Sequence, residues 1–309
     1  MPAEQPPRLA VVTVLFRSAD VLVKTLPTWV RSAEGLPVEF VFVDNAPDGS
    51  CPPVIEQNLP PGSGRYLPDD TNPGFAAGCN RALAHVTADH VLLLNPDVWL
   101  HEDSLGRVLA AVRAEPDVPI ALGLLMHGSE YTGIDLHPIA LFIDRPANGR
   151  RRPIGPSGGA GVFPAELFRR FGGLYEPMFA WGEDADLAFR LHAAGVRTAA
   201  LDLALPHAWG HSVEGDAGLT EFRSFLLARN RVLVAARGLT WPLLLAAAPI
   251  LLVAHLGLAA RRARQGLLRS FLRGVGRGLA MAAGARRDWR GRRLGIAALA
   301  GHLRGREAR

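Results

Sequence analysis

The stretch His90-Val-Leu-Leu-Leu-Asn-Pro-Asp97 decides the fold of this 309-residue chain. Its apolar run indicates a strand that is buried on both faces, because it leaves no alternating polar face for solvent. Asn95 and Asp97 follow the run directly, at the carboxyl end of the strand, where parallel sheets place ligand-binding residues. The stretch therefore predicts an α/β fold with functional side chains at the ends of its strands.

Similar apolar segments flank this stretch and alternate with helical patterns. We expect further strands at residues 9–16, 38–43, 120–126 and 198–205. We expect helices at residues 19–33, 74–86, 102–114 and 165–171. Such alternation is typical of βαβ units in a parallel sheet. Residues 127–159 are rich in Gly, Pro and Arg, and we expect them to form a lid or acceptor-side loop.

Composition indicates a globular chain from a reducing compartment. With 49% hydrophobic residues, the chain can bury a sizeable core. Its two cysteines, Cys51 and Cys79, are too few for a disulfide framework and match no metal-ligand spacing. No small-residue cleavage site follows the first apolar run, so we expect no signal peptide and a cytosolic catalytic part.

Charge is distributed unevenly along the chain. Residues 261–309 contain 14 arginines and only two acids, a net charge of +12, so the remaining 260 residues carry −7 of the total of +5. A basic tail predicts a polyanionic partner. Because a long apolar segment precedes the tail and no nucleic-acid module accompanies it, we expect an anionic membrane surface and no nucleic acid.

Three carboxylates are concentrated in Phe179-Ala-Trp-Gly-Glu-Asp-Ala-Asp-Leu-Ala-Phe-Arg190. Glu183, Asp184 and Asp186 fall in the first turn of an expected short helix. The free N–H groups and the positive dipole end of a helix start favour ionised carboxylates. The group is therefore a candidate for a catalytic base, although acids in a first turn are also ordinary helix stabilisers.

Other polar residues occupy the ends of the expected strands. Asp44 can accept hydrogen bonds from a sugar or a base, or open an Asx turn. The segment Asn72-Pro-Gly-Phe-Ala-Ala-Gly-Cys-Asn80 places small residues at a helix start, where N–H groups can meet a phosphate. Asp97 offers hard oxygen ligands for a divalent cation, and His207 follows a strand that could bring it nearby. Each of these residues also has a purely structural interpretation.

Taken in order along the chain, these motifs resemble the family 2 glycosyltransferases, and most of all their rhamnosyltransferase-type members. The matching segments are Val11-Val-Thr, Val43-Asp-Asn-Ala, Asn72 to Asn80, Leu93-Leu-Asn-Pro-Asp-Val, Gly158-Gly-Ala-Gly-Val-Phe, Phe171-Gly-Gly-Leu-Tyr-Glu, Trp181-Gly-Glu-Asp-Ala-Asp-Leu and His207. The resemblance covers about residues 9–237. It implies the GT-A fold (the Rossmann-like nucleotide-diphospho-sugar transferase fold), an inverting mechanism, a nucleoside-diphosphate sugar donor and Mg²⁺ or Mn²⁺.

The resemblance also implies roles for individual residues. Asp184 would be the general base, and Trp181 and Glu183 would shape the acceptor site. Asp97 and His207 would hold the metal. The residues implied for nucleotide-sugar binding are Thr13, Asp44, Asn72, Gly74, Asn80, Asn95 and Asp97.

The carboxyl-terminal part is expected to associate with a membrane. Residues 1–237 would form the catalytic domain and residues 238–309 a helical region in which 241–260 are long enough to cross a bilayer. A single crossing with the arginine tail in the cytosol would separate the catalytic domain from nucleotide sugars. We therefore expect monotopic attachment at the cytoplasmic face, with a core helix as the alternative. Gly274, Gly276 and Gly278 weaken the next helix in water, so we expect it to form only on the membrane.

The sequence thus predicts a membrane-associated inverting glycosyltransferase in cell-wall or polysaccharide biosynthesis. It would move a sugar, rhamnose among the candidates, to a hydroxyl of a lipid-linked or cell-surface glycan. A galactofuranosyl- or other hexosyltransferase is an alternative. A catalytically silent glycosyltransferase-like membrane scaffold is another, and hydrolysis of a donor panel separates it from the enzymes.

Overall fold

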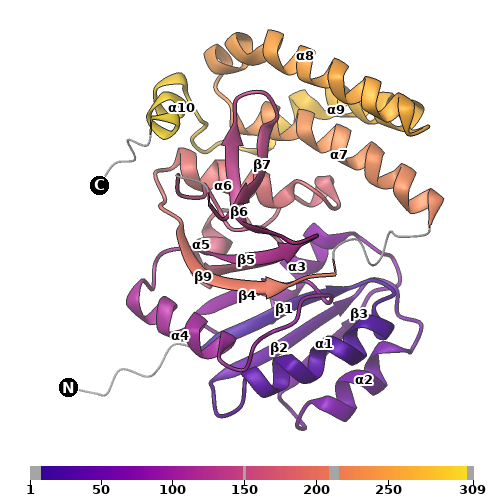
Figure 1. Cartoon of the computed structure of the whole chain (residues 1–309), viewed down its shortest axis with the longest axis vertical. Helices are drawn as coiled ribbons and strands as arrows, with labels where there is room; N and C mark the ends of the chain where they lie inside the picture. The colour runs from indigo at the N-terminus through magenta and orange to yellow at the C-terminus, as the bar shows by residue number, and fades with distance from the viewer. Residues whose placement is uncertain (1–7, 149–150, 209–215, 305–309) are drawn as a thin grey trace.

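The computed structural model describes residues 8–148, 151–208 and 216–304, in which a nine-stranded mixed sheet lies between layers of helices (Figure 1). The strands are β1 (Leu9–Leu15), β2 (Val38–Asp44), β3 (Gly64–Pro68), β4 (His90–Leu94), β5 (Ile120–Met126), β6 (Ser129–His137), β7 (Leu141–Pro146), β8 (Ala160–Pro164) and β9 (Ala199–Pro206). The helices are α1 (Ala19–Ser32), α2 (Cys51–Asn58), α3 (Phe75–Leu83), α4 (Ser104–Ala114), α5 (Ala165–Arg170), the 3-10 turn η1 (Glu176–Met178), α6 (Glu183–Ala193), α7 (Ala217–Gly238), α8 (Trp241–Arg264), α9 (Leu268–Asp288) and α10 (Ile296–Leu303).

The sheet is parallel in its first half and mixed in its second. The strand order is β3-β2-β1-β4-β8-β5-β6-β7, with β9 beside β5. Strands β1 to β4 pair in parallel, as the alternation of strands and helices predicts. β8 lies antiparallel between β4 and β5. An all-parallel sheet is therefore wrong beyond β4, because a hairpin and not a crossover helix follows β5.

Residues 127–159 do not form the expected loop, because most of them belong to the β6–β7 hairpin. Ile134, Leu136 and Leu141 from this hairpin are buried in a core that they share with α6 and α7. Burial of these apolar side chains stabilises the strands and outweighs the Gly and Pro content that favours a loop. The hairpin is therefore an integral part of the folded core.

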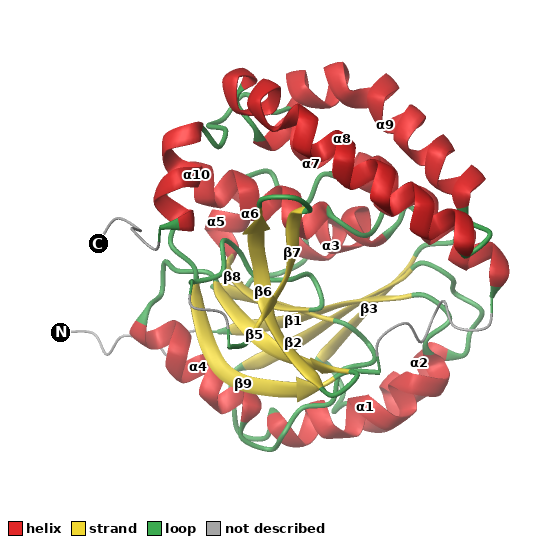
Figure 2. Cartoon of the chain, turned by 45° about the horizontal axis from the view of Figure 1, so that its top comes forward, coloured by secondary structure: helices red, strands yellow, loops and turns green. Residues whose placement is uncertain are grey.

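Three apolar cores join the layers. The first lies between the sheet and α1, α2 and α4, and the second lies between the opposite face and α3, α5 and α6 (Figure 2). The third lies between the β6–β7 hairpin, α6 and the carboxyl-terminal helices, and it includes Phe189, Leu233, Leu243 and Ala285. The tail helices therefore pack on helix α6 through buried apolar side chains.

Glycines allow α9 to pack closely on α7. A Cβ at Gly278 would lie 2.8 Å from the carbonyl oxygen of Arg229, and a Cβ at Gly274 would clash with the carbonyl oxygen of Phe225. The expectation that α9 forms only on a membrane is wrong. The same glycines that weaken an isolated helix permit a close helix–helix contact, and that contact supplies the stabilising free energy.

Helix α8 lies on the outside of the carboxyl-terminal layer (Figures 1 and 2). It is the one helix in the described part of the chain that is long and apolar enough to cross a membrane, judged by length and composition alone. Only 6% of its most apolar window is buried, so the core-helix alternative is wrong. Its exposed apolar side chains include Trp241, Leu245, Leu252 and Leu256.

Candidate active site

A cavity of about 390 Å³ lies at the carboxyl ends of β1, β2 and β4. Its other walls come from the β6–β7 hairpin, the segment before β8, the start of α6 and the first turns of α7. The predicted site residues that line it are Asn72, Gly74, Asn95, Asp97, Trp181, Glu183, Asp184 and His207. The fold thus brings together residues that are more than 130 positions apart in the sequence.

Asp184 is the second residue of α6 and is half-buried at the cavity. Its Oδ2 accepts a hydrogen bond from the Gly158 N–H at 2.9 Å, and its Oδ1 accepts one from the Ala185 N–H at 2.7 Å. Burial raises the pKa of this carboxyl, while the two N–H groups act in the opposite direction. In the described chain it forms no salt bridge, so no fixed cation neutralises it. The carboxylate is therefore oriented but free to take up a proton.

Glu183 precedes Asp184 in α6, and its side chain is buried, with 4% of the residue exposed. Burial raises the pKa of Glu183 well above its ordinary value, and the Asp184 charge raises it further. Its Oε2 has no hydrogen-bond partner among the described residues. Burial and the neighbouring carboxylate therefore both disfavour the ionised form of Glu183.

The turn before α6 has a strained backbone. Phe179 and Trp181 both have positive φ angles, 65° and 62°, which are unusual for bulky residues. The buried Asn230 on α7 holds the turn, because its Nδ2 lies 2.8–2.9 Å from the carbonyl oxygens of Met178, Ala180 and Trp181. This contact keeps the Trp181 side chain at the cavity and fixes the start of α6.

Asp97 and His207 form a hydrogen-bonded pair in the cavity lining. The Nε2 atom of His207 lies 3.0 Å from Oδ1 of Asp97, and the two side chains are almost completely buried. The described residues contain no group of three or more His, Cys, Asp or Glu that could hold a metal ion. Mg²⁺ commonly takes one or two protein ligands and completes its shell with substrate phosphates and water. The pair fits a cation shared with a diphosphate, and does not fit one held by protein alone.

Two consecutive glycines connect these walls. The Gly158 N–H donates to Asp184, and the Gly159 carbonyl accepts a hydrogen bond from the Asn95 N–H at 3.0 Å. Asn95 is two residues from Asp97 in the turn after β4. The carboxylate on α6 and the Asp97 turn are therefore fixed relative to each other by backbone contacts.

The Asn72–Gly74 segment forms a further wall. Asn72 has a φ of 45° and Gly74 a φ of 93°. A Cβ at Gly74 would lie 2.6 Å from the Phe179 ring, so only glycine fits between them. The Asn45 side chain donates to the Gly74 carbonyl at 3.0 Å and supports this approach. Asn45 also lines the cavity; it belongs to the Val43-Asp-Asn-Ala segment, in which the sequence predicted a role only for Asp44.

Thr13, Asp44 and Asn80 lie outside the cavity lining. Thr13 is buried within β1. Asp44 is fully buried and accepts hydrogen bonds from the Tyr66 hydroxyl at 2.7 Å and the Ala46 N–H at 3.0 Å. The Asn80 amide exchanges hydrogen bonds with the Leu174 backbone. Of these three residues, only Asn80 lines a cavity, a second one beside Leu174 and Glu176.

Comparison with known proteins settles the family. The model of "Glycosyl transferase family 2" matches residues 10–170, which is more than half of the chain. The chain belongs to glycosyl transferase family 2. No curated protein shows a significant match to the sequence of this family 2 glycosyltransferase.

Solved structures show that the glycosyltransferase has the GT-A fold, as the sequence predicts. It is similar to a mannosyltransferase from Pyrobaculum calidifontis in complex with GDP-Man and Mn²⁺, with a TM-score of 0.54, 18% identity, and 91% and 87% of the two chains covered. It is also similar to GalNAc-T7 with UDP, GalNAc and Mn²⁺, with a TM-score of 0.57 and 14% identity over 77% of this chain and 49% of that chain. Residues 1–349 of TarS from S. aureus are similar with a TM-score of 0.53 and 13% identity over 98% of this chain and 93% of that chain.

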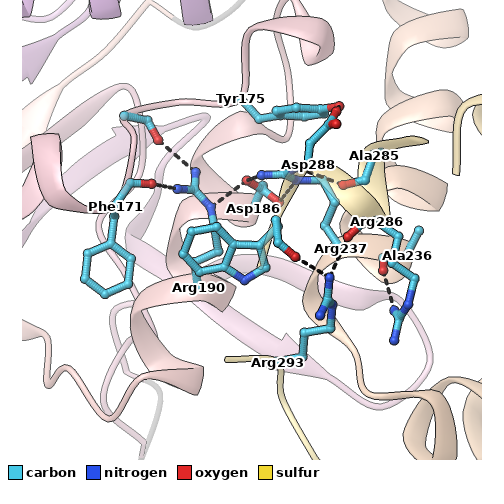
Figure 3. Close-up of polar contacts among 12 residues, drawn as sticks. Phe171, Tyr175, Asp186, Arg190, Ala236, Arg237, Ala285, Arg286, Asp288 and Arg293 are labelled. Atoms are coloured by element: carbon cyan, nitrogen blue, oxygen red, sulfur yellow. Dashed lines mark hydrogen bonds and ion pairs between the residues drawn. The ribbon is translucent and has the colours of Figure 1, made fainter. Parts of the chain in front are cut away.

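Asp186 of the glycosyltransferase does not line the cavity, and its carboxylate lies in a buried ion-pair cluster (Figure 3). Its carboxylate accepts hydrogen bonds from Arg190 Nε at 2.8 Å and from Arg237 Nε at 2.7 Å. Arg237 also donates to the Ala285 carbonyl at 3.0 Å, and its guanidinium lies 3.6 Å from the centre of the Tyr175 ring. The cluster therefore ties α6 to α7 and α9.

Asp144 and Arg223 are cavity residues that sequence reasoning missed. Part of Asp144 stays open to solvent, but the surrounding protein raises its pKa to about 6, and the Asp184 charge contributes further. The Arg223 guanidinium lies 5.8 Å from the centre of the Trp181 ring. No local pattern marks either residue, because the fold places them at the cavity through β7 and α7.

Proposed function

We propose that the glycosyltransferase is an inverting enzyme that moves a sugar from a nucleoside diphosphate to an acceptor hydroxyl. One observation carries the proposal: Gly158 and Gly159 fix the Asp184 carboxylate and the Asp97 turn on two walls of one cavity. An acceptor hydroxyl beside Asp184 and a donor diphosphate beside Asp97 would meet between these walls. Attack from the side opposite the diphosphate inverts the anomeric centre.

The charges of the site suit this division of roles. Asp184 takes the proton of the attacking hydroxyl, and such general-base help is typically worth ~10²- to 10⁴-fold in rate. Glu183 and Trp181 contact the acceptor. Asp97 and His207 would hold Mg²⁺ or Mn²⁺, which when bound neutralises the charge that grows on the leaving diphosphate. A diphosphate leaves as a stable anion, so the site needs no second carboxylic acid to protonate it.

The donor and acceptor belong to the proposal. Two similar structures contain GDP-Man or UDP together with Mn²⁺, which supports a nucleotide-sugar donor and a divalent cation. We propose rhamnose as the donor sugar, on the sequence resemblance, with galactofuranose or another hexose as the alternative. The acceptor would be a lipid-linked or cell-surface glycan.

We further propose monotopic attachment to the cytoplasmic face of a membrane. The support is α8, on which Leu245, Leu252 and Leu256 lie one to two turns apart and are 61–70% exposed. Positions with this spacing share one helical face, so the side chains form an apolar stripe. Arg261, Arg262 and Arg264 follow at the helix end, where anionic lipids would attract them.

A donor screen tests the enzymatic proposal. The melting temperature of the protein should rise with at least one nucleoside-diphosphate sugar, and more so when Mn²⁺ is present, because a ligand of the native state stabilises it. The same donor should be slowly hydrolysed. A protein that neither binds nor hydrolyses any donor would instead be the silent scaffold.

Vesicle flotation tests the membrane proposal. The wild type should float with phosphatidylglycerol vesicles, and a variant with Leu245, Leu252 and Leu256 changed to Gln should not. The matched control carries Val23→Gln and Ile139→Gln, which replace side chains that are 50% and 53% exposed elsewhere on the surface. Equal flotation of both variants contradicts a role for α8.

A further inference from the structure

Strand β7 brings to the cavity a carboxylate that the proposed mechanism does not use. Asp144 and Phe142 stand two residues apart on β7, so their side chains lie on one face of the strand, and both line the cavity. Asp144 pairs with Ile134 of β6, which lines the cavity as well. Asp144 is exposed there, and among the described residues its carboxylate has neither a salt bridge nor a hydrogen-bond partner. The carboxylate is therefore available to a ligand of the cavity.

The Phe142 ring fixes β7 against the start of α6. It packs edge to face on the Phe189 ring at 6.5 Å, and a Cβ at Gly182 would lie 3.8 Å from its Cζ atom. Gly182 directly precedes α6, in which Asp184 is the second residue. A strand advances about 3.3 Å per residue, so Asp144 lies roughly 7 Å further along β7 than this contact. The structure thus holds the Asp144 and Asp184 carboxylates in set positions around one cavity.

The charged groups near Asp144 come from three other parts of the chain. Burial and then the Asp184 charge on α6 raise the pKa of Asp144 to about 6, whereas the charges of Arg223 on α7 and His207 after β9 act in the opposite direction. A carboxyl whose pKa is raised in the folded protein makes the fold less stable when it ionises. Asp144 therefore has no stabilising role at neutral pH that would account for its place in the cavity.

The surroundings of Asp144 suit one kind of ligand group. Ligand cavities combine apolar walls with a few polar groups that fix the orientation of the ligand. Phe142 and Trp181 provide aromatic walls in this cavity. An ionised carboxylate only accepts hydrogen bonds, so Asp144 requires a donor on the ligand. A sugar ring matches both features, because it has an apolar face of C–H groups and hydroxyl donors around its edge.

We propose that Asp144 determines acceptor specificity by accepting a hydrogen bond from a second hydroxyl of an acceptor sugar, while Asp184 takes the proton of the reacting hydroxyl. This inference rests on the proposed transferase function. It adds a residue that selects the acceptor and takes no part in the proton transfer. The β6–β7 hairpin then contributes directly to substrate choice.

Transfer to p-nitrophenyl glycosides of gluco, galacto, manno and rhamno configuration tests the proposal, with the full-length protein and the donor that the melting screen identifies. Asp144→Ala should raise KM for the acceptor about tenfold, the loss of one charge-assisted hydrogen bond. It should change kcat by no more than about twofold, because the contact is equally present in the ground and transition states. A fall in kcat of ~10²-fold or more would make Asp144 a base and overturn the proposal.

Asp202→Ala is the matched control. Asp202 is an exposed carboxylate on another strand, β9, and does not line the cavity. Its removal should change neither KM nor kcat. Equal rises in KM for Asp144→Ala and Asp202→Ala would show that the effect comes from the lost surface charge and would overturn the contact.

Deoxy acceptors identify the hydroxyl that Asp144 contacts. The wild type should use one monodeoxy analogue of its best glycoside about tenfold less efficiently than the parent, because the buried polar partner is then left unpaired. Asp144→Ala should use the two equally well, since the same contact cannot be lost twice. Equal discrimination by the wild type and Asp144→Ala at every hydroxyl position overturns the proposal.

The melting temperature separates a specificity role from a structural one. Asp144→Ala should melt at or above the wild-type temperature at about pH 8, because it removes a carboxylate whose ionised form the fold disfavours. A lower melting temperature together with losses in both kcat and KM would make Asp144 a structural residue.

Donor hydrolysis distinguishes failure of this proposal from failure of the transferase function. If the wild type hydrolyses a donor but uses none of the glycosides, the sugar contact of Asp144 is wrong and the donor chemistry stands. If no donor is bound or hydrolysed, the transferase function fails as well.

Discussion

Asp184 and Asp186 stand two residues apart on one turn of α6, yet the fold gives them opposite surroundings. Asp186 is fully buried and bonded to two guanidinium groups. Asp184 lines the cavity, accepts two backbone N–H groups and has no salt bridge in the described chain. A carboxylate that is bonded to two guanidinium groups is fixed inside the protein, whereas a carboxylate at a cavity with no salt bridge can meet a substrate. The acidic motif thus combines a structural anchor with a candidate base.

The largest expected effect is the loss of sugar transfer in Asp184→Asn. Asp184→Asn keeps the shape of the side chain but removes the proton acceptor, so transfer should fall ~10²- to 10⁴-fold. Donor binding and the melting temperature should stay near those of the wild type. Initial rates with a verified acceptor measure the change, and near-wild-type turnover would show that Asp184 is not the base.

Asp186→Asn should lower the stability of the protein. It leaves Arg190 and Arg237 buried without their carboxylate, and such a loss typically costs about 3–5 kcal/mol of unfolding free energy. Urea unfolding, with Asp184→Asn as the matched control, measures it. A variant that unfolds at the wild-type urea concentration but has lost activity would place Asp186 in the chemistry.

A smaller effect is expected at the Asp97–His207 pair. Asp97→Ala should weaken donor binding about tenfold or more when Mn²⁺ is present, and His207→Ala should act in the same direction but more mildly. Titrations with and without EDTA measure both changes. Wild-type activity that survives EDTA unchanged would remove the metal assignment from both residues.

The smallest expected effect concerns the pH dependence of stability at Glu183. Its pKa is raised in the folded protein, so the folded state holds this proton more tightly than the unfolded state. The resulting stability is present below the ordinary pKa of Glu and is lost as pH rises through the raised pKa. Glu183→Gln cannot ionise, so its melting temperature should fall less than that of the wild type, by about 2 °C, between pH 5 and pH 8. Identical pH slopes would contradict a buried titration at this residue.

Local patterns predicted the first half of the fold well. The strands at 90–94 and 120–126 match β4 and β5, since a short apolar run between turn residues leaves few alternatives. The β6–β7 hairpin was missed because its stability comes from burial against α6 and α7, which no local window contains. The strand β8 lies between β4 and β5 through pairing over about 70 residues, which is equally invisible locally.

The candidate site shows the same division. Ordered motifs pointed to Asp97, Asp184 and His207, which the fold brings to one cavity. Asn230 was missed because it is an ordinary polar residue within α7, and its function depends on carbonyl groups some 50 residues earlier. Thr13 and Asn80 carry the expected motif letters but do not line this cavity, so their proposed contact with the donor stays a prediction.

The glycine contact between α9 and α7 makes the cavity sensitive to substitutions in the carboxyl-terminal tail. One side of α7 carries Asn230, which donates hydrogen bonds to the turn before α6. The other side packs against Gly274 and Gly278. A single methyl group at either glycine would push α7 toward or along that turn. Variants far out in the carboxyl-terminal tail should therefore behave like active-site variants, and an inventory of cavity residues alone would understate which positions the chemistry constrains.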